Sequence, residues 1–545
     1  VGKLWEHLDQ GDGVNHGQRT QDSGPMLLEG IGEVSSIEDI MADIPPKNAA
    51  DRLVSRYFNS PMPGIVIIHG PAFEQEYKQF WLDPSQVSLP WIAMLFGVLN
   101  VGSFMYLRSQ EGWPTELGNL LEVMELFQRR STECLLISKY GTAPTNYTME
   151  ALLLNLQGEF VRRRDAHLGL WVMGGVAIRV AMRMGYHRDP DNHPRITPLQ
   201  GEMRRRIWAE YQCDTRPPSN LLDEDFGPET TQLPPSRPET QLTPVLYTIA
   251  KSRLSLIFRT IFNHVSLGRV EAYEEIMTYD QRLHNAYRRL PAKLQIVALE
   301  DCITTPPSLL TRRYNLEFLF QKARCMLHRH HMSKSYEDPR YNYSRTACVD
   351  AAMTVLTHQA NIFKEVQVGG LLYADRWFIS SLERHDFLLA AMIICLELSS
   401  RTNEQPAPSG NDGFLKFSRE AMTQALENSQ SFWAELKASS VEAKQAFDML
   451  SVMLGSVATS GTTHIEHISI PPSTEVPLSG SSSMPTQASF SYGTPSVSDQ
   501  SGFATSIEGI GAMLTSPHID NWDLWESLIQ SPTIPENFEL PDLPH

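Results

Sequence analysis

The chain has 545 residues, of which 46 are Lys or Arg and 63 are Asp or Glu, giving a formal net charge of −17. This acidic balance excludes a chain that binds nucleic acid through bulk positive charge. Hydrophobic residues make up 41% and aromatic residues 9% of the sequence, which is enough to bury a large core and excludes wholesale disorder.

The first part of the chain has mixed composition. Residues 1–48 are rich in Gly, Asp, Gln and Pro and are expected to form a partly ordered lead-in. A helix should follow, with Asp51 as its N-cap and Asn59-Ser60-Pro61 at its end. The segment IVIIHGP (65–71) is then expected to be extended.

Helical patterns dominate the rest of the body. Apolar residues spaced by three and four predict helices over 88–107, 115–140, 148–164, 167–185, 199–210, 243–264 and 270–290, and three to five more up to residue 455. Gly185 suits a left-handed cap at the end of its helix. No strand-helix alternation, fixed repeat or glycine-rich phosphate loop occurs. The predicted fold class is therefore all-α, an irregular multi-helix domain over 49–455.

One apolar run fits either a membrane-spanning helix or a helix in the protein core. Residues 85–107 contain no charged side chain and are long enough to span a bilayer. Pro90, Asn100, Gly102 and Ser103 dilute this run, and no second such run exists. We therefore interpret it as a helix buried on all sides and predict no membrane span.

The C-terminal part is acidic and low in complexity. Residues 456–545 contain ten acidic residues and neither lysine nor arginine. Ser, Thr, Pro and Gly dominate 456–518, which is expected to be a disordered linker. Residues 519–545 form an acidic and aromatic segment, so the prediction is a disordered acidic tail on a helical body.

A stripe of apolar residues marks this last segment. Ile519, Trp522, Trp525 and Leu528, here called the Trp522 stripe, recur at steps of three and alternate with Asp520, Asp523 and Glu526. Such a segment stays soluble and folds as a helix into the hydrophobic groove of a partner. We predict partner binding through the stripe, and docking onto the chain's own body is the alternative.

The six cysteines give no cofactor site. They stand at least 23 residues apart, without any Cys-x-x-Cys pair, so neither a disulfide framework nor a zinc site is predicted. Cys134, Cys325 and Cys395 lie in apolar helical patterns, which is typical of buried free thiols in a reducing compartment. The sequence therefore indicates an intracellular protein without a cofactor in this chain.

Three clusters of polar residues were considered as sites of chemistry. Asp223-Glu224-Asp225 stands among prolines without a second acidic cluster, so a solvated loop is favoured over a magnesium site. His328, His330 and His331 lack a nearby carboxylate and do not share one helix face, which disfavours metal binding. Arg204-Arg205-Arg206 is interpreted as a solvated or salt-bridged helix end. No enzyme is predicted.

Four segments occur in a characteristic order. An Ala-rich helix ends in Gly-Tyr-His-Arg-Asp, followed by Glu-x-x-Arg-Arg-Arg-x-Trp and by an Asp-containing loop that ends in Leu-Pro. The segments are AIRVAMRMGYHRDP (177–190), ITPLQGEMRRRIW (196–208), CDTRPPSNLLDEDF (213–226) and QLPPSRPET (232–240). In this order the body resembles the regulatory, or middle-homology, domain of fungal zinc binuclear cluster transcription factors of the xylanolytic-activator type.

Further segments extend the resemblance over about residues 1–455. VGKLWEHL (1–8), SRTACVDAA (344–352) and ERHDFLLAAMIICLEL (383–398) resemble other family segments, and the Trp522 region is similar to a family activation segment. Two features depart from the family. The six-cysteine zinc cluster is absent, and only four residues separate Trp208 from Cys213, where the family normally has a turn and a helix.

The resemblance implies a fungal transcription regulator in the nucleus. Its zinc cluster, and with it zinc and DNA binding, is expected upstream of Val1, while the tail recruits a transcriptional coactivator. A homodimer and a small-molecule effector are further expectations from the family. The alternative function is a stand-alone helical ligand-binding or scaffold protein that sequesters partners without binding DNA.

Overall fold

The computed structural model describes residues 25–460 with internal gaps. The gaps are at 31, 33, 60–65, 110–112, 115–116, 163–167, 210–214, 267–271, 374–383, 401–415 and 439–440. All regular structure in the described residues is helical, without a strand among them, so the all-α prediction is confirmed for this part of the chain.

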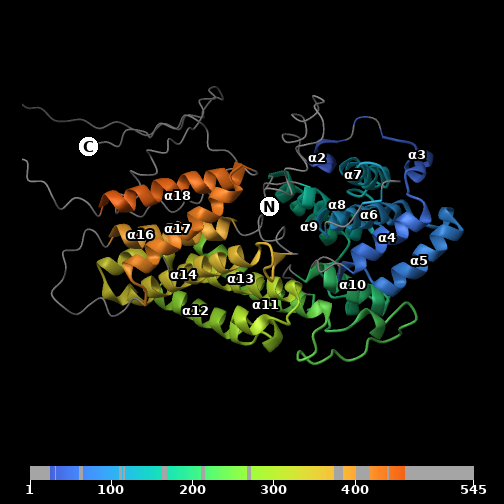
Figure 1. Ribbon diagram of the computed structural model, residues 1–545. Coiled ribbons are helices and arrows are strands. Elements are labelled where there is room, and N and C mark those ends of the chain that lie inside the picture. Colours follow the sequence, from blue (N-terminus) through green and yellow to red (C-terminus); the bar gives the residue numbers. More distant parts are fainter. Residues whose placement is uncertain are drawn as a thin grey trace, which may run out of the picture.

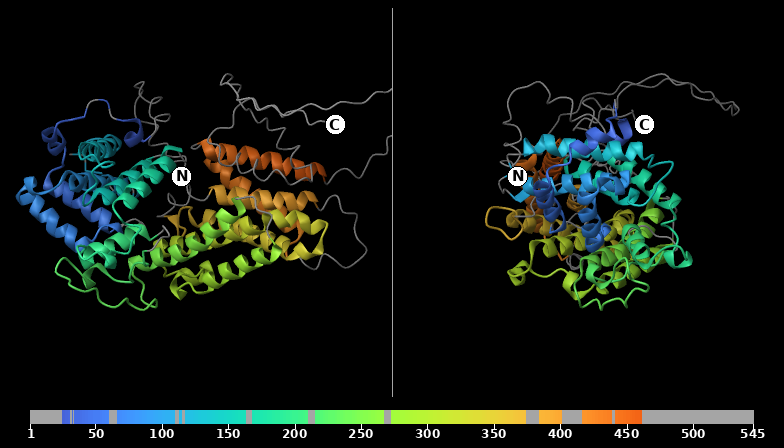
Figure 2. Two further views of the ribbon diagram at one scale, coloured as in Figure 1. Left: turned by 180° about the vertical axis from the view of Figure 1, so that it is seen from behind. Right: turned by 90° about the vertical axis from the view of Figure 1, so that its right-hand side faces the viewer.

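The helices form two halves that lie side by side (Figures 1 and 2). The helices of the N-terminal half are α2 (Met26–Glu29), α3 (Ile37–Ala42), α4 (Lys47–Phe58), α5 (Gly70–Leu82), α6 (Leu89–Ser109), α7 (Leu120–Ile137), α8 (Thr148–Arg162), α9 (Leu168–Arg183) and α10 (Pro198–Trp208). Those of the C-terminal half are α11 (Pro244–Ser266), α12 (Tyr273–Arg288), α13 (Pro307–Met332), α14 (Asn342–Glu365), α16 (Arg384–Ser400), α17 (Arg419–Leu436) and α18 (Val441–Ser460).

Each half has its own hydrophobic core. In the N-terminal half, α4, α7 and α8 pack around α6, and the core extends to Leu27 and Ile40 of the two short helices. In the C-terminal half, α13, α14, α16, α17 and α18 enclose a separate cluster that includes Phe387 and Trp433. A loop over 215–243 and the long helix α11 connect the halves (Figure 1).

Helix α6 is the centre of the N-terminal core. Among the described residues it is the one helix long and apolar enough to cross a membrane, but 94% of its most apolar window is buried inside the protein. Two of its polar side chains donate hydrogen bonds inside the protein, the Asn100 amide to Gln128 Oε1 at 2.8 Å and the Ser103 hydroxyl to the Leu99 carbonyl at 2.8 Å. The prediction of a helix buried on all sides is confirmed.

Most helix predictions are confirmed to within a few residues at their ends. Gly185 has φ +81°, and the Tyr186 amide donates to the Ala181 carbonyl at 3.0 Å, which closes α9 with the predicted left-handed cap. The described residues after 300 contain five α-helices, in agreement with the prediction of three to five.

Two local predictions are wrong. Asp51 does not cap α4, because Pro46 precedes the first turn and Asp51 lies one turn inside, paired with Lys47 at 2.7 Å. The end of the expected extended segment instead starts α5, where the His69 side chain accepts from the Ala72 amide at 3.1 Å and Pro71 stands in the first turn. Proline in a first turn and a side-chain cap favour helix initiation.

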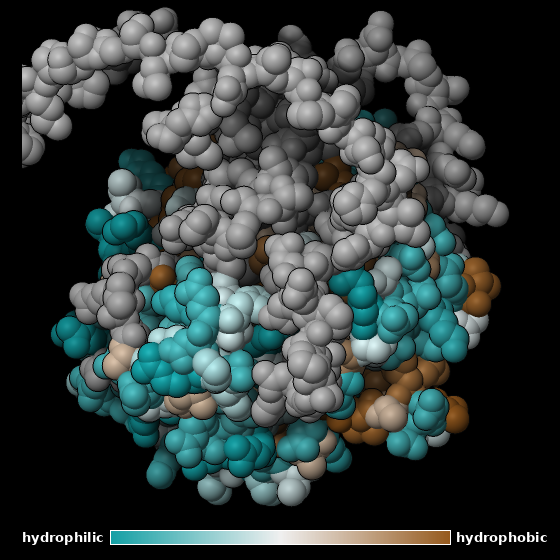
Figure 3. Space-filling model, turned by 90° about the vertical axis from the view of Figure 1, so that its left-hand side faces the viewer, coloured by the Kyte–Doolittle hydropathy of each residue, from teal (hydrophilic) through white to brown (hydrophobic). Residues whose placement is uncertain are grey.

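The outer surface of the C-terminal half is mostly polar. Seen from that side, the described surface is largely hydrophilic, and hydrophobic residues gather mainly in one area at its lower right (Figure 3). The apolar residues of this half are therefore mostly turned inward.

Candidate functional site

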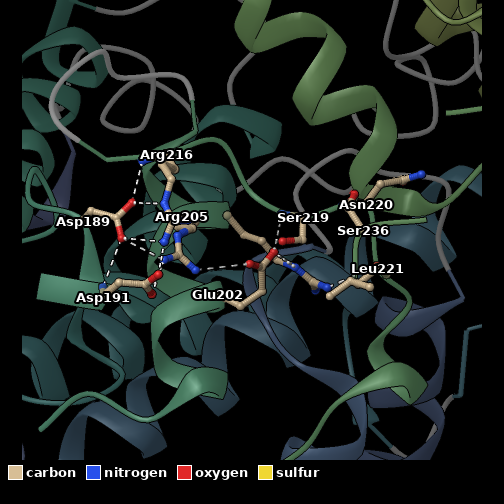
Figure 4. Close-up of polar contacts among 10 residues, drawn as sticks. Asp189, Asp191, Glu202, Arg205, Arg216, Ser219, Asn220, Leu221 and Ser236 are labelled. Carbon is tan, nitrogen blue, oxygen red and sulfur yellow. Dashed lines mark hydrogen bonds and ion pairs between the residues drawn. The ribbon is translucent and has the colours of Figure 1, made fainter. Parts of the chain in front are cut away.

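The four segments of the family order meet at one place in the structure. Asp189 follows α9, Glu202, Arg205 and Arg206 lie on α10, and the loop over 215–243 folds back across them (Figure 4). A capping box between Thr197 and Gln200 starts α10 and sets the direction in which its arginines point.

Arg205 lies between two carboxylates. Its Nη2 is 2.8 Å from Asp189 Oδ1 and 2.6 Å from Asp191 Oδ1 (Figure 4). Arg216 reaches the same two acids from the loop, with its Nε 3.1 Å from Asp189 Oδ2. Burial opposes ionisation of Asp189, but hydrogen bonds from Arg205 and Arg216 outweigh it and lower the pKa of this carboxyl to about 2. Asp189 is therefore ionised at neutral pH.

Arg206 is the interior partner of the loop. It is 3% exposed, its Nη1 is 2.6 Å from Asp223 Oδ1, and its guanidinium lies 5.1 Å from the centre of the Phe226 ring. Glu202 Oε1 accepts from the Ser219 amide at 2.9 Å. Burial raises the pKa of Glu202, against the opposing effect of Arg206. Backbone and side chains of the loop thus bind the charged side chains of α10.

A second set of contacts closes the loop on itself. The Asn220 side chain donates to the carbonyls of Arg237 and Pro238, both at 3.2 Å, and accepts from the Thr243 hydroxyl at 2.6 Å. Thr243 in turn accepts from the Leu246 amide in the first turn of α11. Arg237 Nε donates to Asp225 Oδ2 at 2.6 Å and lowers the pKa of that carboxyl. The loop therefore fixes the start of α11 relative to α10.

The same loop binds the start of α5. The Gly70 amide donates to Asp223 Oδ2 at 2.9 Å, and His69 Nε2 lies 2.9 Å from the Asp223 carbonyl oxygen and 3.1 Å from that of Phe226. Asp223 thus contacts both α10 and α5. The prediction of a solvated loop is wrong for Asp223 and Asp225, and Arg205 and Arg206 are salt-bridged but buried rather than solvated.

A cavity lies against this cluster. Its volume is about 540 Å³, and it is bounded by residues of the segment between α9 and α10, of α10 itself and of the loop over 215–243. The lining residues are Pro190, Asp191, His193, Pro194, Ile196, Thr197, Pro198, Gly201, Arg205, Arg216, Pro217, Ser219, Thr231, Gln232 and Leu233. The ion pairs of Asp189 and Asp191 with Arg205 and Arg216, and of Asp223 with Arg206, hold the loop against α10.

The histidines that were considered as metal ligands have another role. His328 is fully buried, with its Nδ1 2.9 Å from Ser344 Oγ and its Nε2 3.1 Å from Asp280 Oδ1. Burial lowers the pKa of His328, and hydrogen bonds from His284, His328 and Tyr343 keep the pKa of Asp280 well below its usual range despite burial. This cluster joins α12, α13 and α14. Within the described residues there is no group of three His, Cys, Asp or Glu side chains that could hold a metal.

The predicted partner-binding residues Ile519, Trp522, Trp525 and Leu528 lie outside the described residues. Sequence reasoning missed the roles of Asp189, Asp191 and Arg216. For Asp189 and Arg216 the available signal is their position in the segments of the family order, which the structure brings together, and Asp191 directly follows the first of these segments.

Comparison with known proteins identifies the family. The chain is 36% identical over 490 residues to the Zn(2)-C6 fungal-type transcription factor mpsB of Macrophomina phaseolina, an alignment that covers 85% of this chain and 65% of mpsB. It is 32% identical to the equisetin cluster transcription factor eqxF of Fusarium heterosporum, over 84% of this chain and 70% of eqxF. The chain belongs to the Zn(2)-C6 fungal-type transcription factor family.

Other family members agree with this assignment. The Zn(2)-C6 fungal-type transcription factor pigI of Monascus ruber is 34% identical over 82% of this chain and 59% of its own length. The chain thus spans less than two thirds of the length of mpsB and pigI. A scan of described protein families finds no match, and no solved structure matches the chain.

Proposed function

We propose that this chain is the regulatory body and activation tail of a fungal nuclear transcription regulator of RNA polymerase II genes. The observation that carries the proposal is the alignment of 84–85% of the chain with named fungal transcription factors. The helical body supports a regulatory role, because the charged side chains of α10 bind the loop over 215–243, and this loop leads into α11 of the C-terminal half. An enzymatic role is not proposed.

The proposal assigns DNA binding to residues upstream of Val1. A six-cysteine zinc cluster there would hold the zinc and read DNA, while this net-negative chain alone gives no sequence-specific shift of DNA at physiological salt. Sequencing the transcript upstream of Val1 and across the codons for residues 210–214 tests this assignment. A start codon directly before Val1 would favour the alternative of a partner-sequestering scaffold.

We assign coactivator recruitment to the Trp522 stripe. In a fusion of the chain to a heterologous DNA-binding domain, Trp522→Ala with Trp525→Ala should reduce reporter activation at least about tenfold, because buried tryptophans dominate such interfaces. Phe490→Ala with Phe503→Ala, two aromatic residues of the 456–518 segment, is the matched control and should leave activation unchanged. Full activation by the tryptophan variant would contradict the assignment.

Names of relatives suggest the kind of target genes. Two relatives are the equisetin cluster and fusarisetin A cluster transcription factors, each 32% identical to this chain. We propose that this chain likewise regulates a gene cluster. Deletion of its gene should lower transcripts of a contiguous set of genes, and scattered changes would contradict this. The homodimer and the small-molecule effector expected from the family stay predictions.

A further inference from the structure

Helix α9 exposes an apolar face that no described element covers. Trp171 is 78% exposed, Val172 39% and Met182 43%. Gly175 and Arg179 are also exposed, and all five residues fall within about one third of the helix circumference. We call these five residues the α9 outer face. A tryptophan exposed to this degree beside further apolar side chains is typical of a binding surface.

The opposite side of α9 is firmly anchored. Met173, Ala177, Val180 and Ala181 are buried in the N-terminal core, and α8 packs along the helix. Substitutions on the outer face therefore leave the core unchanged. Trp171 lies in the first turn of α9, two residues before the buried Met173.

Positive charge borders the α9 outer face. Arg179 is exposed and has no ionic or hydrogen-bond partner among the described residues. Arg183 is exposed and donates to the Thr142 carbonyl at 2.8 Å, which brings the turn that carries exposed Lys139 to the same end of α9. The helix itself contains no acidic residue. The complementary occupant is therefore an apolar helix with acidic residues along it.

The chain contains one such segment. In residues 519–529, the Trp522 stripe lies beside Asp520, Asp523 and Glu526, and neither lysine nor arginine occurs from 456 to the C-terminus. A second copy of α9 is a poor occupant by comparison, because it would bring Arg179 and Arg183 of both copies together without any acid on either helix.

The length of the α9 outer face agrees with that of a helix formed by the Trp522 stripe. From Trp171 to Met182 the helix rises about 16 Å, and a helix from Ile519 to Leu528 would rise about 14 Å. A Cβ atom added at Gly174 or Gly175 would meet nothing within 4 Å, so these glycines leave room for a large side chain of an approaching helix. From Ser460, where α18 ends, a coil of the 58 intervening residues has a root-mean-square span of about 40 Å.

We propose that the α9 outer face binds the chain's own 519–529 segment. The tryptophans of the stripe pack beside Trp171 over the glycines, and the acids of the segment face Arg179, Arg183 and Lys139. Because the linkage makes this contact intramolecular, a weak interaction suffices to occupy it. The inference rests on the proposed function in one respect: if the Trp522 stripe recruits a coactivator, the contact with α9 competes with that recruitment.

Carbodiimide cross-linking of the purified full chain tests the contact. The reagent joins a lysine amine to a nearby carboxylate, so we expect a cross-link between Lys139 and Asp520, Asp523 or Glu526, read by mass spectrometry after chymotryptic digestion. A mixture of ¹⁴N- and ¹⁵N-labelled chains separates contacts within one chain from contacts between chains. We expect the cross-link within single chains.

Two variants on exposed positions probe the surface. Trp171→Ala and Arg179→Glu should each lower the yield of this cross-link, the tryptophan variant at least about tenfold. Arg289→Glu, at an exposed arginine after α12, is the matched control and should leave the yield unchanged. The proposal is overturned if the cross-link is absent, if about half of the cross-linked pairs in an equimolar mixture join a light to a heavy chain, or if neither surface variant lowers the yield.

The reporter assay separates this inference from the proposed function. The cross-link yield of the surface variants tests only the contact between α9 and the segment. The reporter activity of the fusion with Trp522→Ala and Trp525→Ala tests only coactivator recruitment. With both correct, Trp171→Ala in the full fusion raises reporter activation, because the stripe is no longer held by α9.

Discussion

Arg206 connects α10 to the loop over 215–243. Its buried guanidinium pairs with Asp223, whose side chain is 27% exposed, and lies near the buried Glu202 and the Phe226 ring. Removal of one partner from a buried ion pair leaves the other charge without compensation, which costs about 3–5 kcal/mol. We therefore expect Arg206→Ala to lower the free energy of unfolding by that amount, measured by chemical denaturation.

The matched control is an exposed arginine pair. Arg253 and Glu239 lie 2.6 Å apart with 45% and 42% of their side chains exposed. Water and salt screen such a pair, so Arg253→Ala should cost less than about 1 kcal/mol. Equal losses for the two variants would show that the junction does not depend on the buried charge.

Glu150 gives a pH dependence with a definite sign. Its Oε2 is shut off from solvent without a hydrogen-bond partner, and burial raises the pKa of the carboxyl from 4.5 to about 7. The unfolded state therefore loses this proton at lower pH than the folded state. The ionisation of Glu150 does not change the free energy of unfolding below about pH 4.5. It lowers that free energy increasingly as the pH rises to about 7.

Glu150→Gln removes this titration. We expect the melting temperature of the variant to exceed that of the unsubstituted chain at pH 8, by an amount equivalent to about 1–3 kcal/mol, and the two to converge at pH 4.5. Calorimetry at a series of pH values measures the difference. A constant difference across this range would contradict the raised pKa.

At the scale of single elements, the helices follow from local pattern. Apolar spacing placed α6, α9 and α11 within a few residues of their observed ends, because a helix that buries one face must repeat that spacing. The start of α4 was misplaced because Asp51 has the side chain of a cap, while the ion pair with Lys47 uses that carboxylate inside the helix. Residue types that cap helices also occur on helix surfaces, so the type of a residue alone does not determine where a helix begins.

The contact between α4 and α6 depends on a glycine. A Cβ atom at Gly102 would lie 2.3 Å from the Leu53 carbonyl oxygen, which belongs to the backbone and has little freedom to move. We expect Gly102→Ala to lower the free energy of unfolding by about 1–3 kcal/mol, measured by chemical denaturation. Gly455→Ala on α18 is the control, because an added Cβ meets nothing within 4 Å there and alanine favours the helix.

At the scale of the whole molecule, the two main hydrophobic cores lie in different halves. The cores have no residue in common, and the halves are joined by the loop over 215–243, by α11 and by a small buried cluster of Val66, Val245 and Ile249. Cores that share no residue unfold as separate units when the contact between them is small.

Calorimetry should therefore resolve two transitions. Asp223→Asn, which weakens the pairing with Arg206, should lower the transition of the N-terminal half. Glu397→Gln should lower the other transition, since Glu397 is fully buried and accepts from Arg345 at 2.7 Å and from Tyr336 at 2.9 Å. A single transition that both variants lower equally would contradict independent halves.

The sequence alone determined the class of fold, most helix positions, the buried state of α6 and the family resemblance. These properties depend on composition and on neighbours three or four residues apart, which a sequence displays directly. Only the tertiary structure decided that Asp189, Arg205, Arg216 and Asp223 form one cluster and that Trp171 faces solvent. The cluster and the exposure of Trp171 depend on which surfaces meet in the folded chain. Pairing of charged residues that are 16 to 27 positions apart leaves no periodic pattern in the sequence.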